Sequence, residues 1–470
     1  MERLHLSLPA TVHLIGVCGT GMGALAGLLK ARGYTVTGSD AHPYPPMSTE
    51  LAALGIPIFE GYRKENLALR PDLVVVGNVC KKDHPEAAAA REMGLRCSSM
   101  PRTLQDLLLR DKRCLVVAGT HGKTTTTSLA AHLLHATGRD PSTLIGGVAA
   151  DFGAGFRLGG GPDFVVEGDE YDSAYFEKVP KFLAYTPHAA VITSVEHDHI
   201  DIYPTPAAYG AAFAALTRIV RPGPLAIYAG DTGARTAARE FDGEVVSYGV
   251  DGDPLPDGTR WIAAPRGHGA LEVRCDGAST GVWRTPLAGR HNARNTLAAL
   301  ILAHVGSGVP LEELKGALPS FRGVARRQQL LGKPRGISVY DDFAHHPTAV
   351  RETLAALLER HGDGRVLAAF EPRSATACRS LHQRAYAEAF DGAARVVIAP
   401  VGRDLPPDDR LDVAALANDL RERGLDAHAA ASFDEVVDLV TSWAKPGDAV
   451  VLLSNGAFGG LHGRILEALA

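Results

Sequence analysis

The sequence predicts an α/β protein of three domains, and three observations support this prediction. Short apolar runs alternate with helical stretches along most of the chain, a pattern typical of parallel sheets covered by helices. A chain of 470 residues has room for three domains of ordinary size. The pattern of apolar runs and helical stretches changes near residues 110 and 322, so we expect domains at residues 1–110, 111–322 and 323–470.

The first domain is expected to be Rossmann-like. Its predicted strand, helix and two further strands lie at residues 12–17, 22–32, 34–40 and 72–77. A glycine-rich turn at residues 16–23 joins the first strand to the helix, and Asp40 ends the second strand. Such a turn brings backbone N–H groups to a helix start, where a diphosphate can bind. The fit to a dinucleotide fingerprint is poor because Cys18 takes the second glycine position, so NAD binding and a purely structural turn are the alternatives.

A phosphate-binding loop is predicted at the start of the central domain, which reads Gly119-Thr120-His121-Gly122-Lys123-Thr124-Thr125. An apolar run at residues 114–118 precedes this loop as a strand, and residues 128–134 follow it as a helix. Backbone N–H groups and the helix N-terminus would face the phosphates, with Lys123 on the terminal phosphates and the Thr124 hydroxyl on Mg²⁺. The loop is shorter than the usual pattern, because Val117 stands where the first glycine would be. We expect a P-loop ATPase domain, with a glycine turn and a surface lysine as the alternative.

Acidic and histidine side chains follow two further predicted strands of the central sheet. One acidic run, Glu167 to Asp172, comes after a strand at residues 164–167, and the His199 loop comes after a strand at residues 189–194. Because parallel strands of a P-loop domain end near the nucleotide, carboxylates and imidazoles there can hold Mg²⁺. The strand register favours Glu167 as the metal-facing residue, with Glu170 second. A solvated acidic loop and a surface His/Asp loop are the alternatives.

Two groups of polar residues mark a helix start and a domain boundary. His291 and Asn295 are candidates for hydrogen bonds to adenine or a neighbouring loop, although Asn292 could simply cap that helix. Arg326 and Arg327 stand at the second domain boundary, where an arginine can swing onto a phosphate when domains close. A hinge salt bridge is the alternative for the arginines.

The third domain repeats the Rossmann-like pattern. Its strands are expected at residues 337–341, 366–370, 396–399 and 449–453. Asp342 and His345 follow its first strand and could contact ribose or metal. Arg373 and Ser374 follow the second strand and are typical of a carboxylate receptor, with a plain loop as the alternative. Within the central domain, a Gly/Pro-rich insert at roughly residues 242–286 is expected to form β-hairpins rather than βαβ units.

Composition argues against several classes of function. The formal charge of −5, without any basic run, argues against nucleic-acid binding. Six cysteines are scattered without a C-x-x-C pair, which suits reduced thiols in the cytosol. The N-terminus leads into no long apolar stretch, and no segment has about 18 uninterrupted apolar residues, so we expect neither export nor a membrane span. A cytoplasmic protein, monomeric or weakly dimeric, is the expectation.

Taken in order, these residues resemble the Mur ligases, ATP-dependent enzymes that form amide bonds in bacterial cell-wall synthesis. The resemblance covers essentially the whole chain. Its specific motifs are the loop at residues 119–125, Asp198-His199-Ile200-Asp201, Gly289-Arg290-His291-Asn292 with Asn295, and Asp341-Asp342-Phe343-Ala344-His345-His346-Pro347-Thr348. The resemblance implies that ATP phosphorylates a carboxylate, that Mg²⁺ assists, and that an amine attacks the resulting acyl phosphate.

Within the family, the glycine turn and the motif around His345 are similar to two subgroups that use UDP-N-acetylmuramate itself. One subgroup adds L-alanine, and the other attaches the recycled murein tripeptide L-alanyl-γ-D-glutamyl-meso-diaminopimelate. Tyr171 and the pair Pro372-Arg373 look like the tripeptide subgroup, because the alanine subgroup typically has serine and Pro-His at these places. The resemblance therefore implies the tripeptide as amine substrate, with L-alanine as the alternative.

Three positions depart from the family's pattern. Cys18 replaces a glycine, which bears on the fit of the first loop to UDP. Several Mur ligases carry a carbamylated lysine after the equivalent of His199, but residues 209–215 contain no lysine, as in the two subgroups above. Another group must therefore support the metals. Gln329 replaces a glutamate that often follows the paired arginines.

The resemblance implies a complete set of site residues. Catalytic roles fall to Lys123, His199, Arg327, Asp342 and His345. ATP is expected to contact Gly119, Thr120, His121, Gly122, Lys123, Thr124, Thr125, His291, Asn295 and Arg327. The Mg²⁺ ligands are expected to be Thr124, Glu167, Glu170 and His199. Substrate contacts fall to Gly19, Thr20, Gly21, Met22, Ser39, Asp40, Arg373 and Ser374. Since this set is complete, a non-catalytic nucleotide-dependent binding protein of the same fold is the less favoured alternative.

Overall fold

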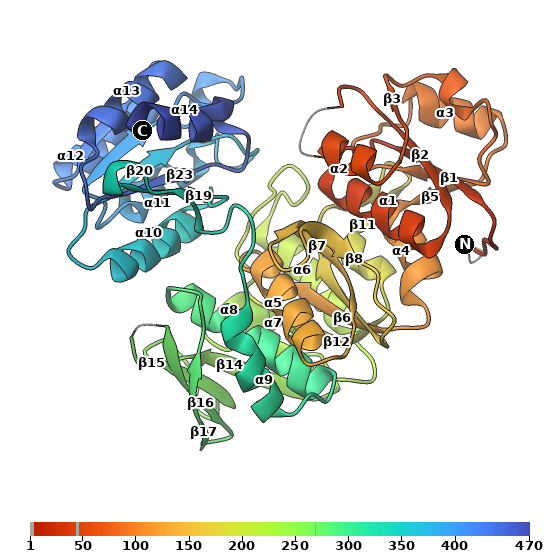
Figure 1. Ribbon diagram of the computed structural model, residues 1–470, viewed down its shortest axis with the longest axis horizontal. Coiled ribbons are helices and arrows are strands. Elements are labelled where there is room, and N and C mark those ends of the chain that lie inside the picture. Colours follow the sequence, from red (N-terminus) through yellow and green to blue (C-terminus); the bar gives the residue numbers. More distant parts are fainter. Residues whose placement is uncertain (1–3, 44–46, 268) are drawn as a thin grey trace.

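The computed structural model describes residues 4–43, 47–267 and 269–470, and these residues form three α/β domains (Figure 1). The three main sheets take their strands from residues 11–99, 113–284 and 329–453. In Figure 1 the N-terminal and C-terminal domains both lie above the central domain, on opposite sides. The predicted fold class and the three-domain arrangement are confirmed.

The N-terminal sheet has five parallel strands in the order β3-β2-β1-β4-β5. Its strands are β1 (Thr11–Ile15), β2 (Thr35–Asp40), β3 (Ile58–Glu60), β4 (Leu73–Val76) and β5 (Cys97–Ser99). Its helices are α1 (Thr20–Arg32), α2 (Met47–Ala53), α3 (Pro85–Glu92) and α4 (Met100–Leu104). The strand order reverses direction between β1 and β4, so the glycine turn after β1 lies where doubly wound sheets bind ligands.

The central sheet has ten strands in the order β17-β16-β15-β14-β13-β12-β6-β9-β7-β8. They are β6 (Arg113–Ala118), β7 (Ser142–Ala149), β8 (Ala154–Arg157), β9 (Asp163–Gly168), β12 (Pro187–Ile192), β13 (Leu225–Tyr228), β14 (Val245–Val250), β15 (Trp261–Pro265), β16 (Ala270–Cys275) and β17 (Ala278–Arg284). A separate hairpin consists of β10 (Asp172–Ala174) and β11 (Glu177–Pro180). The helices are α5 (Lys123–Ala136), α6 (Pro206–Thr217), α7 (Thr232–Ala237), α8 (Arg290–Ile301) and α9 (Leu311–Ala317).

Strand β6 lies inside the central sheet, parallel to β12 on one side and to β9 on the other. Val116 and Ala118 pack into the core on one face, while Leu115 and Val117 pack into the core on the other. A strand buried on both faces reads as an unbroken apolar run, which is why the sequence revealed it. Since the three strands are parallel, their carboxyl ends and the loops that follow meet at one edge of the sheet.

The β-rich insert differs in one respect from the prediction. β15, β16 and β17 form antiparallel hairpins, as expected. β14, however, pairs in parallel with both β13 and β15, so the prediction of hairpins alone was wrong for this strand. Continuing the central sheet satisfies the backbone N–H and C=O groups that β13 would otherwise expose as an edge strand.

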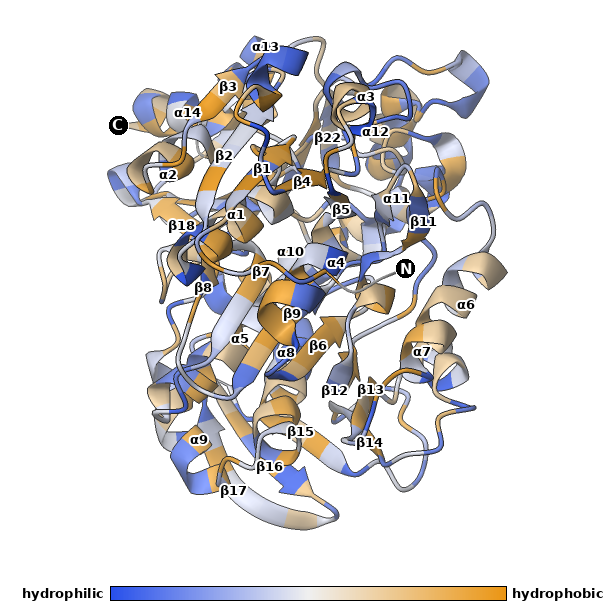
Figure 2. Cartoon of the chain, turned by 90° about the vertical axis from the view of Figure 1, so that its right-hand side faces the viewer, coloured by the Kyte–Doolittle hydropathy of each residue, from blue (hydrophilic) through white to orange (hydrophobic). Residues whose placement is uncertain are grey.

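The C-terminal sheet has six strands in the order β18-β19-β23-β20-β21-β22, with only β18 antiparallel to its neighbour. The strands are β18 (Gln329–Gly332), β19 (Ser338–Asp342), β20 (Val366–Phe370), β21 (Arg395–Ile398), β22 (Asp426–Ala429) and β23 (Ala449–Leu453). The helices are α10 (Pro347–His361), α11 (Gln383–Ala389), α12 (Val413–Glu422), α13 (Phe433–Trp443) and α14 (Leu461–Leu469). Hydrophobic residues predominate in the strands, and outer helices such as α12 and α13 carry hydrophilic residues beside hydrophobic ones (Figure 2).

The N-terminal domain docks on the central domain through helix α1 and through the β10–β11 hairpin. Helix α1 packs against β7 and β8, and Gly27 lies so close to Phe156 that an added Cβ would be 2.1 Å from its ring. Ser99 Oγ and Arg102 Nη2 donate hydrogen bonds to the carboxylate of Glu177 at 2.6 and 2.8 Å. Charged hydrogen bonds of this kind fix the register of two docked surfaces.

Helices α8 and α10 join the central and C-terminal domains through a charged cluster. Arg294 Nη1 of α8 donates to Glu352 Oε1 of α10 at 3.2 Å, and His291 Nδ1 lies 3.6 Å from Glu352 Oε2. Burial alone would raise the pKa of Glu352, but the nearby His291 imidazole and the Arg294 guanidinium lower it to about 2. The carboxylate therefore favours the docked arrangement of the two domains while it is ionised.

We expect this contact to weaken in acid. The pKa of Glu352 is lower in the folded state than in the unfolded chain, so its contribution is complete above about pH 5. This contribution is lost as the pH falls through the folded-state pKa of about 2. At neutral pH the ionised carboxylate should contribute about 2 kcal/mol to the free energy of unfolding, because it is only partly exposed to solvent. Urea unfolding of the wild type and of Glu352→Gln between pH 7 and pH 2 measures it. The stability difference should shrink with acidification, and a difference that stays constant would contradict the assignment.

The described residues contain no helix that is both long and apolar enough to cross a membrane. All six cysteines are free, in agreement with the scattered spacing of the thiols.

Candidate active site

The predicted phosphate loop joins the carboxyl end of β6 to helix α5, and its geometry requires two glycines. Gly119 and Gly122 have φ angles of +134° and +79°. A Cβ at Gly119 would lie 2.1 Å from Thr193 Oγ1, and a Cβ at Gly122 would lie 2.2 Å from Asn295 Oδ1. Helix α5 begins at Lys123, within the loop, and the N–H groups of a first helical turn have no intrahelical acceptors. The loop thus presents backbone donors and a positive helix end of the kind that binds phosphate.

Lys123, the first residue of α5, forms an ion pair with a buried carboxylate. Its Nζ donates to Glu170 Oε1 and Oε2 at 3.0 and 2.9 Å, and to the Gly119 carbonyl at 2.6 Å. Burial would lower the pKa of Lys123, but Glu170 and Glu167 raise it, so the ammonium group stays charged. Burial would likewise raise the pKa of Glu170, but Lys123 and His199 lower it. The contacts hold one positive charge at the end of the phosphate loop.

Thr124 and Glu167 form a pair of oxygen donors beside Lys123. Thr124 Oγ1 donates to Glu167 Oε1 at 3.0 Å, and the other carboxylate oxygen accepts from Gly146 N at 2.7 Å. Burial raises the pKa of Glu167, although Lys123 opposes this effect. A hydroxyl and a carboxylate are the hard oxygen ligands that Mg²⁺ prefers, so these two side chains fit that ion.

His199 lies on the other side of Glu170, in the loop after β12. Its Nε2 lies 3.1 Å from Glu170 Oε1. The backbone of His199 has a φ of +52°, and its N–H donates to Asp198 Oδ1 at 2.7 Å, which stabilises this uncommon conformation. Burial would lower the pKa of His199, but Glu170 and Asp198 raise it. The predicted residues Lys123, Glu170 and His199 are therefore brought together in direct contact.

Two arginines follow the central domain, and the second one reaches the phosphate loop. Arg327 Nη2 donates to Thr124 Oγ1 at 3.3 Å, and its guanidinium lies 4.9 Å from the centre of the Phe343 ring. Its neighbour Arg326 lies 5.1 Å from the same ring, but its Nη2 donates to the carbonyl oxygens of Ser454 and Gly456 at 2.6 and 2.7 Å, and its Nε donates to Asp341 Oδ2 at 3.3 Å. Burial lowers the pKa of Arg327, although nearby carboxylates oppose this shift. The two adjacent guanidinium groups therefore share the Phe343 ring but have different hydrogen-bond partners.

Asp342 and His345 lie on the C-terminal side of the same contact. Asp342 accepts hydrogen bonds from Gln328 N and Ala344 N at 2.7 and 2.8 Å, and burial raises its pKa while Arg327 opposes the shift. His345 Nδ1 lies 3.0 Å from the Phe343 carbonyl, and burial lowers its pKa. Both side chains are therefore desolvated groups, and Asp342 lies close enough to Arg327 for the two charges to interact.

His291 and Asn295 lie at the start of helix α8, near the phosphate loop. Asn295 Nδ2 donates to Asn292 Oδ1 at 3.1 Å, and its amide packs against Gly122. His291 Nε2 lies 3.2 Å from Gln328 Nε2. Asn292 does not cap α8, since Gly289 occupies the N-cap position and Asn292 Nδ2 donates to the Ala288 carbonyl at 2.8 Å. The structure thus places this group beside the phosphate loop.

The predicted substrate residues of the first domain form a separate group. Gly19 is the N-cap of α1, Thr20 and Gly21 open the helix, and Asp40 Oδ2 accepts from Cys18 N at 2.8 Å. Cys18 thus uses its backbone N–H in the turn. The remaining two candidates, Ser39 and Met22, are buried in the domain interior with exposures of 0% and 7%.

Arg373 and Ser374 lie after β20 in the C-terminal domain. Arg373 is exposed, and its guanidinium packs so tightly on Gly456 that an added Cβ would be 1.5 Å from Nη1. Ser374 Oγ accepts from Ala377 N at 2.9 Å and so stabilises the turn that follows. Of the two side chains, the arginine is therefore the one open to a ligand.

Sequence reasoning missed two residues that complete the site. Tyr209 of α6 donates to Glu170 Oε1 at 3.3 Å and lies 3.0 Å from Thr120 Oγ1, in the region where other family members carry a lysine. Asp198 is buried; burial would raise its pKa, but His199 and His345 lower it below the usual range. The His-Asp spacing of the loop was a signal for Asp198, whereas nothing in the sequence placed Tyr209.

Taken together, these side chains gather charge and hydrogen-bond donors from two domains around one loop. Lysine, arginine and helix N–H groups can neutralise phosphates, and the flanking oxygen and nitrogen donors can hold a divalent cation. Such a site suits phosphoryl transfer from a nucleoside triphosphate, with specificity supplied by the outer domains.

Comparison with known proteins agrees with this geometry. Three sequence profiles match consecutive parts of the chain: "Mur ligase family, catalytic domain" at residues 11–112, "Mur ligase middle domain" at 117–303, and "Mur ligase, glutamate ligase domain" at 326–456. A UDP-N-acetylmuramate–L-alanyl-γ-D-glutamyl-meso-2,6-diaminoheptandioate ligase of Haemophilus influenzae is 37% identical, covering 97% of this chain and 99% of the relative. A UDP-N-acetylmuramate–L-alanine ligase of Roseiflexus is 36% identical, with coverages of 94% and 96%.

Solved structures resemble the chain over nearly its full length. A murein peptide ligase from Psychrobacter arcticus is 33% identical, with a TM-score of 0.72 and 98% coverage of both chains. The UDP-N-acetylmuramate–alanine ligase of Thermotoga maritima is 25% identical, with a TM-score of 0.79 and coverages of 97% and 98%.

The fold and the site therefore define an ATP-dependent ligase that forms amide bonds. The chain belongs to the Mur ligase family, as its sequence motifs indicated.

Proposed function

We propose that this Mur ligase joins the tripeptide L-alanyl-γ-D-glutamyl-meso-diaminopimelate to UDP-N-acetylmuramate, in the recycling of peptidoglycan in the cytoplasm. The observation that carries the choice of amine is Arg373, an exposed guanidinium that can bind a peptide carboxylate with two parallel hydrogen bonds. L-alanine has one carboxylate, whereas the tripeptide has several. The Haemophilus relative, whose printed name contains this peptide, supports the same choice. The similar identity of the Roseiflexus relative makes addition of L-alanine the second candidate.

The proposed reaction has two chemical steps. An oxygen of the lactyl carboxylate attacks the γ-phosphorus of ATP, the bond to the β,γ-bridging oxygen breaks, and an acyl phosphate and ADP form. The alanyl amine then attacks the acyl carbon. The tetrahedral intermediate collapses to the amide, releasing inorganic phosphate and a proton. Phosphorylation supplies the driving force that a free carboxylate and an amine lack in water, so catalysis consists of positioning and charge neutralisation.

The side chains of the phosphate loop and the domain junction take named roles in this proposal. The loop at residues 119–125 wraps the phosphates, and Lys123 neutralises the β- and γ-phosphates. Arg327 stabilises the transferred phosphoryl group from the junction. His291 and Asn295 contact the adenine, and Asp342 and His345 contact the ribose or the phosphate network. The three domains close before chemistry, because the donors and acceptors lie on three bodies.

We also propose sites for Mg²⁺ and for the sugar nucleotide. Thr124 and Glu167 would hold one Mg²⁺, and His199 with Glu170 would hold a second. When bound, these ions supply charge neutralisation at the phosphate oxygens. The turn formed by Gly19, Thr20, Gly21 and Met22, together with Ser39 and Asp40 of β2, would hold the UDP moiety, and Ser374 would bind the peptide beside Arg373.

A paired-substrate assay tests the choice of amine. The enzyme is incubated with UDP-N-acetylmuramate, ATP and Mg²⁺ and with either the tripeptide or L-alanine, and ADP release is measured. The proposal predicts a larger kcat/KM with the tripeptide. A larger value with L-alanine would replace the proposal by its second candidate, and no ADP release with either amine would overturn both.

We expect Arg373→Ala to weaken tripeptide binding selectively. Loss of a charge-assisted hydrogen bond costs about 1.5–3 kcal/mol, so the KM for the tripeptide should rise by about 10- to 100-fold with little change in kcat. Arg423→Ala is a matched control, because Arg423 is a surface residue that pairs with Asp391 at 2.7 Å in the same domain. Equal KM values for Arg373→Ala and the control would remove Arg373 from the peptide site.

A further inference from the structure

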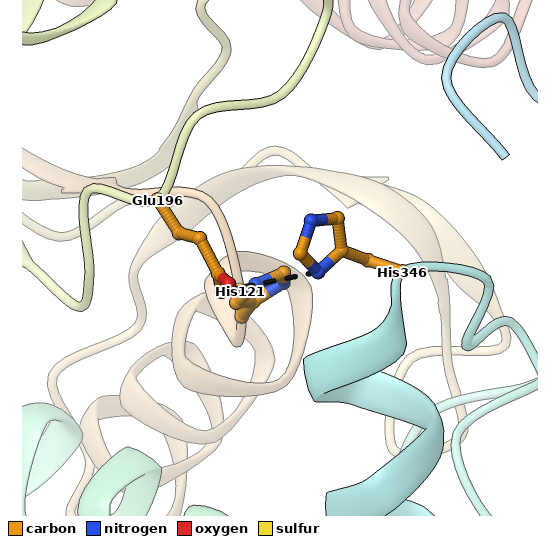
Figure 3. Close-up of side chains that lie close together, drawn as sticks. All are labelled: His121, Glu196 and His346. Carbon is orange, nitrogen blue, oxygen red and sulfur yellow. Dashed lines mark hydrogen bonds and ion pairs between the residues drawn. The ribbon is translucent and has the colours of Figure 1, made fainter. Parts of the chain in front are cut away.

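A second group of potential metal ligands lies at the junction of the central and C-terminal domains. His121 of the phosphate loop, Glu196 of the loop after β12, and His346 at the start of α10 converge there (Figure 3). One ligand atom from each residue lies within 4.8 Å of the others. Figure 3 shows the two imidazoles and the carboxylate directed toward one another.

His346 has an unused ligating capacity. The residue is 5% exposed, and neither of its ring nitrogens has a hydrogen-bond partner. Buried polar atoms in folded proteins are nearly always hydrogen-bonded, so an imidazole without any partner requires an explanation. Its ring packs edge-on against His382 with centroids 4.7 Å apart, which fixes the orientation of the ring. Both ring nitrogens of His346 are therefore buried without a hydrogen-bond partner among the described residues.

The other two ligands are also held in position. His121 Nε2 lies 2.7 Å from Glu196 Oε2, and His346 Nδ1 lies 3.8 Å from the same oxygen. The second carboxylate oxygen of Glu196 accepts from Thr348 Oγ1 at 2.9 Å, an outer contact that orients the carboxylate. In a tetrahedral zinc site with bonds of about 2.0–2.1 Å, ligand atoms lie about 3.3 Å apart. The two separations from the Glu196 oxygen bracket this value, and all three ligand atoms lie within 4.8 Å of one another, so side-chain rotations can bring them to an ion.

We propose that His121, Glu196 and His346 bind a Zn²⁺ ion, which links the central domain to the C-terminal domain. Two imidazoles and one carboxylate are a common protein ligand set for zinc, with a fourth position left to water. Imidazole nitrogen also distinguishes this site from the oxygen donors Thr124 and Glu167, since Mg²⁺ strongly prefers oxygen.

Binding at this place should stabilise the docked arrangement of the two domains. Glu196 and His121 belong to the central domain, whereas His346 belongs to the C-terminal domain, so the complete ligand set exists only when the domains are in contact. A ligand that binds only the folded, docked state stabilises that state in proportion to its free concentration. Zinc should therefore raise the thermal unfolding temperature of the full chain.

Cobalt spectroscopy and calorimetry test the site directly. Without nucleotide, the full-length protein is titrated with Co²⁺ and its visible absorption recorded, and Zn²⁺ binding is measured by isothermal titration calorimetry. The proposal predicts the intense bands of four-coordinate cobalt, saturation at one ion per chain, and their loss when Zn²⁺ is added. Weak, octahedral-type absorption in the wild type would overturn it.

Variants locate the ion. Removal of an outer partner of a metal ligand already costs about 10- to 100-fold in affinity, so His346→Gln and Glu196→Gln should each weaken zinc binding by at least about 100-fold. Glu167→Gln should keep the cobalt spectrum, because Glu167 belongs to the proposed Mg²⁺ site. His428→Gln is the matched control, since His428 is a half-exposed histidine of the same C-terminal domain.

The outcomes separate a metal site from a structural contact. If His346→Gln and Glu196→Gln bind cobalt and zinc as the wild type does, the cluster is a hydrogen-bonded domain contact and the proposal is wrong. Circular dichroism shows whether each variant is folded. If His346→Gln is not folded, Glu196→Gln is the variant that tests the site, because its amide can still form hydrogen bonds with Thr348 and His121. This test is independent of amine specificity, so its failure leaves the proposed ligase function unaffected.

Discussion

Lys123→Ala should abolish ATP-dependent ligation while leaving the fold intact. Lys123 is the first residue of α5, so its ammonium lies at the helix N-terminus, where the terminal phosphates of a nucleotide would lie. Loss of one positive group aimed at a transferring phosphoryl group typically costs about 10³-fold in rate. We therefore expect kcat to fall by about 10³-fold or more, measured as ADP release with UDP-N-acetylmuramate and either amine.

The same substitution has a consequence for stability that needs its own control. Glu170 is 1% exposed, and among the residues that the structure describes, Lys123→Ala leaves its carboxylate with His199 and Tyr209 as side-chain partners. A buried charge that loses its partner destabilises a protein by about 3–5 kcal/mol, so the single variant should melt at a lower temperature. The double variant Lys123→Met/Glu170→Gln removes both charges and should recover much of this stability without recovering activity. If Lys123→Ala retained more than a tenth of the wild-type rate, the assignment of the phosphate loop would be wrong.

The parts of the fold that could be predicted are the strands buried on both faces. The run at residues 114–118 is apolar at every position because β6 has helices packed on both sides, and β23 is predictable for the same reason. The β10–β11 hairpin could not be predicted, since its strands are short and partly exposed. Its position depends on Glu177, whose partners Ser99 and Arg102 lie about 75 residues earlier in the chain.

The site shows the same division between local and tertiary information. Lys123, Glu170 and His199 could be grouped from the sequence, because each follows one of three strands that end at the same edge of a parallel sheet. Tyr209 could not be assigned, because its contact with Glu170 depends on how α6 packs across that edge. His346 differs again, since its significance comes from the docking of a whole domain on the phosphate loop.

The departures from the family's pattern gain a partial explanation. Tyr209 stands in the region where other members carry a lysine, and its hydroxyl contacts the carboxylate of Glu170. Gln329 stands where a glutamate is common, and its Oε1 accepts a hydrogen bond from the backbone N–H of Arg326, which has a φ of +60°. A side-chain amide can therefore support the strained junction without adding a negative charge beside the arginines.

Arg327→Ala should reduce kcat by about 10³-fold with a much smaller effect on the affinity for ATP. Arg327 reaches the phosphate loop from the domain junction, with its Nη2 at 3.3 Å from Thr124 Oγ1, and an arginine supplied to a transferring phosphoryl group contributes about 10³- to 10⁵-fold to the rate. Its effect should appear mainly in kcat, because such a contact strengthens as charge develops in the transition state. Arg327→Lys should restore little activity, since lysine lacks the planar fork that binds two phosphate oxygens.

The adjacent residue provides the matched control. Arg326 carries the same charge one position earlier, but it donates to the carbonyl oxygens of Ser454 and Gly456. Arg326→Ala leaves those buried acceptors without a partner, so its unfolding temperature should fall while kcat stays within about tenfold of the wild type. Single-turnover phosphoryl transfer and thermal unfolding, measured on both variants, separate the two roles. In our proposal only Arg327 contacts the transferred phosphate, so the two variants should differ in kcat. Equal losses of kcat would contradict this and would mean that both arginines act by holding the domains together.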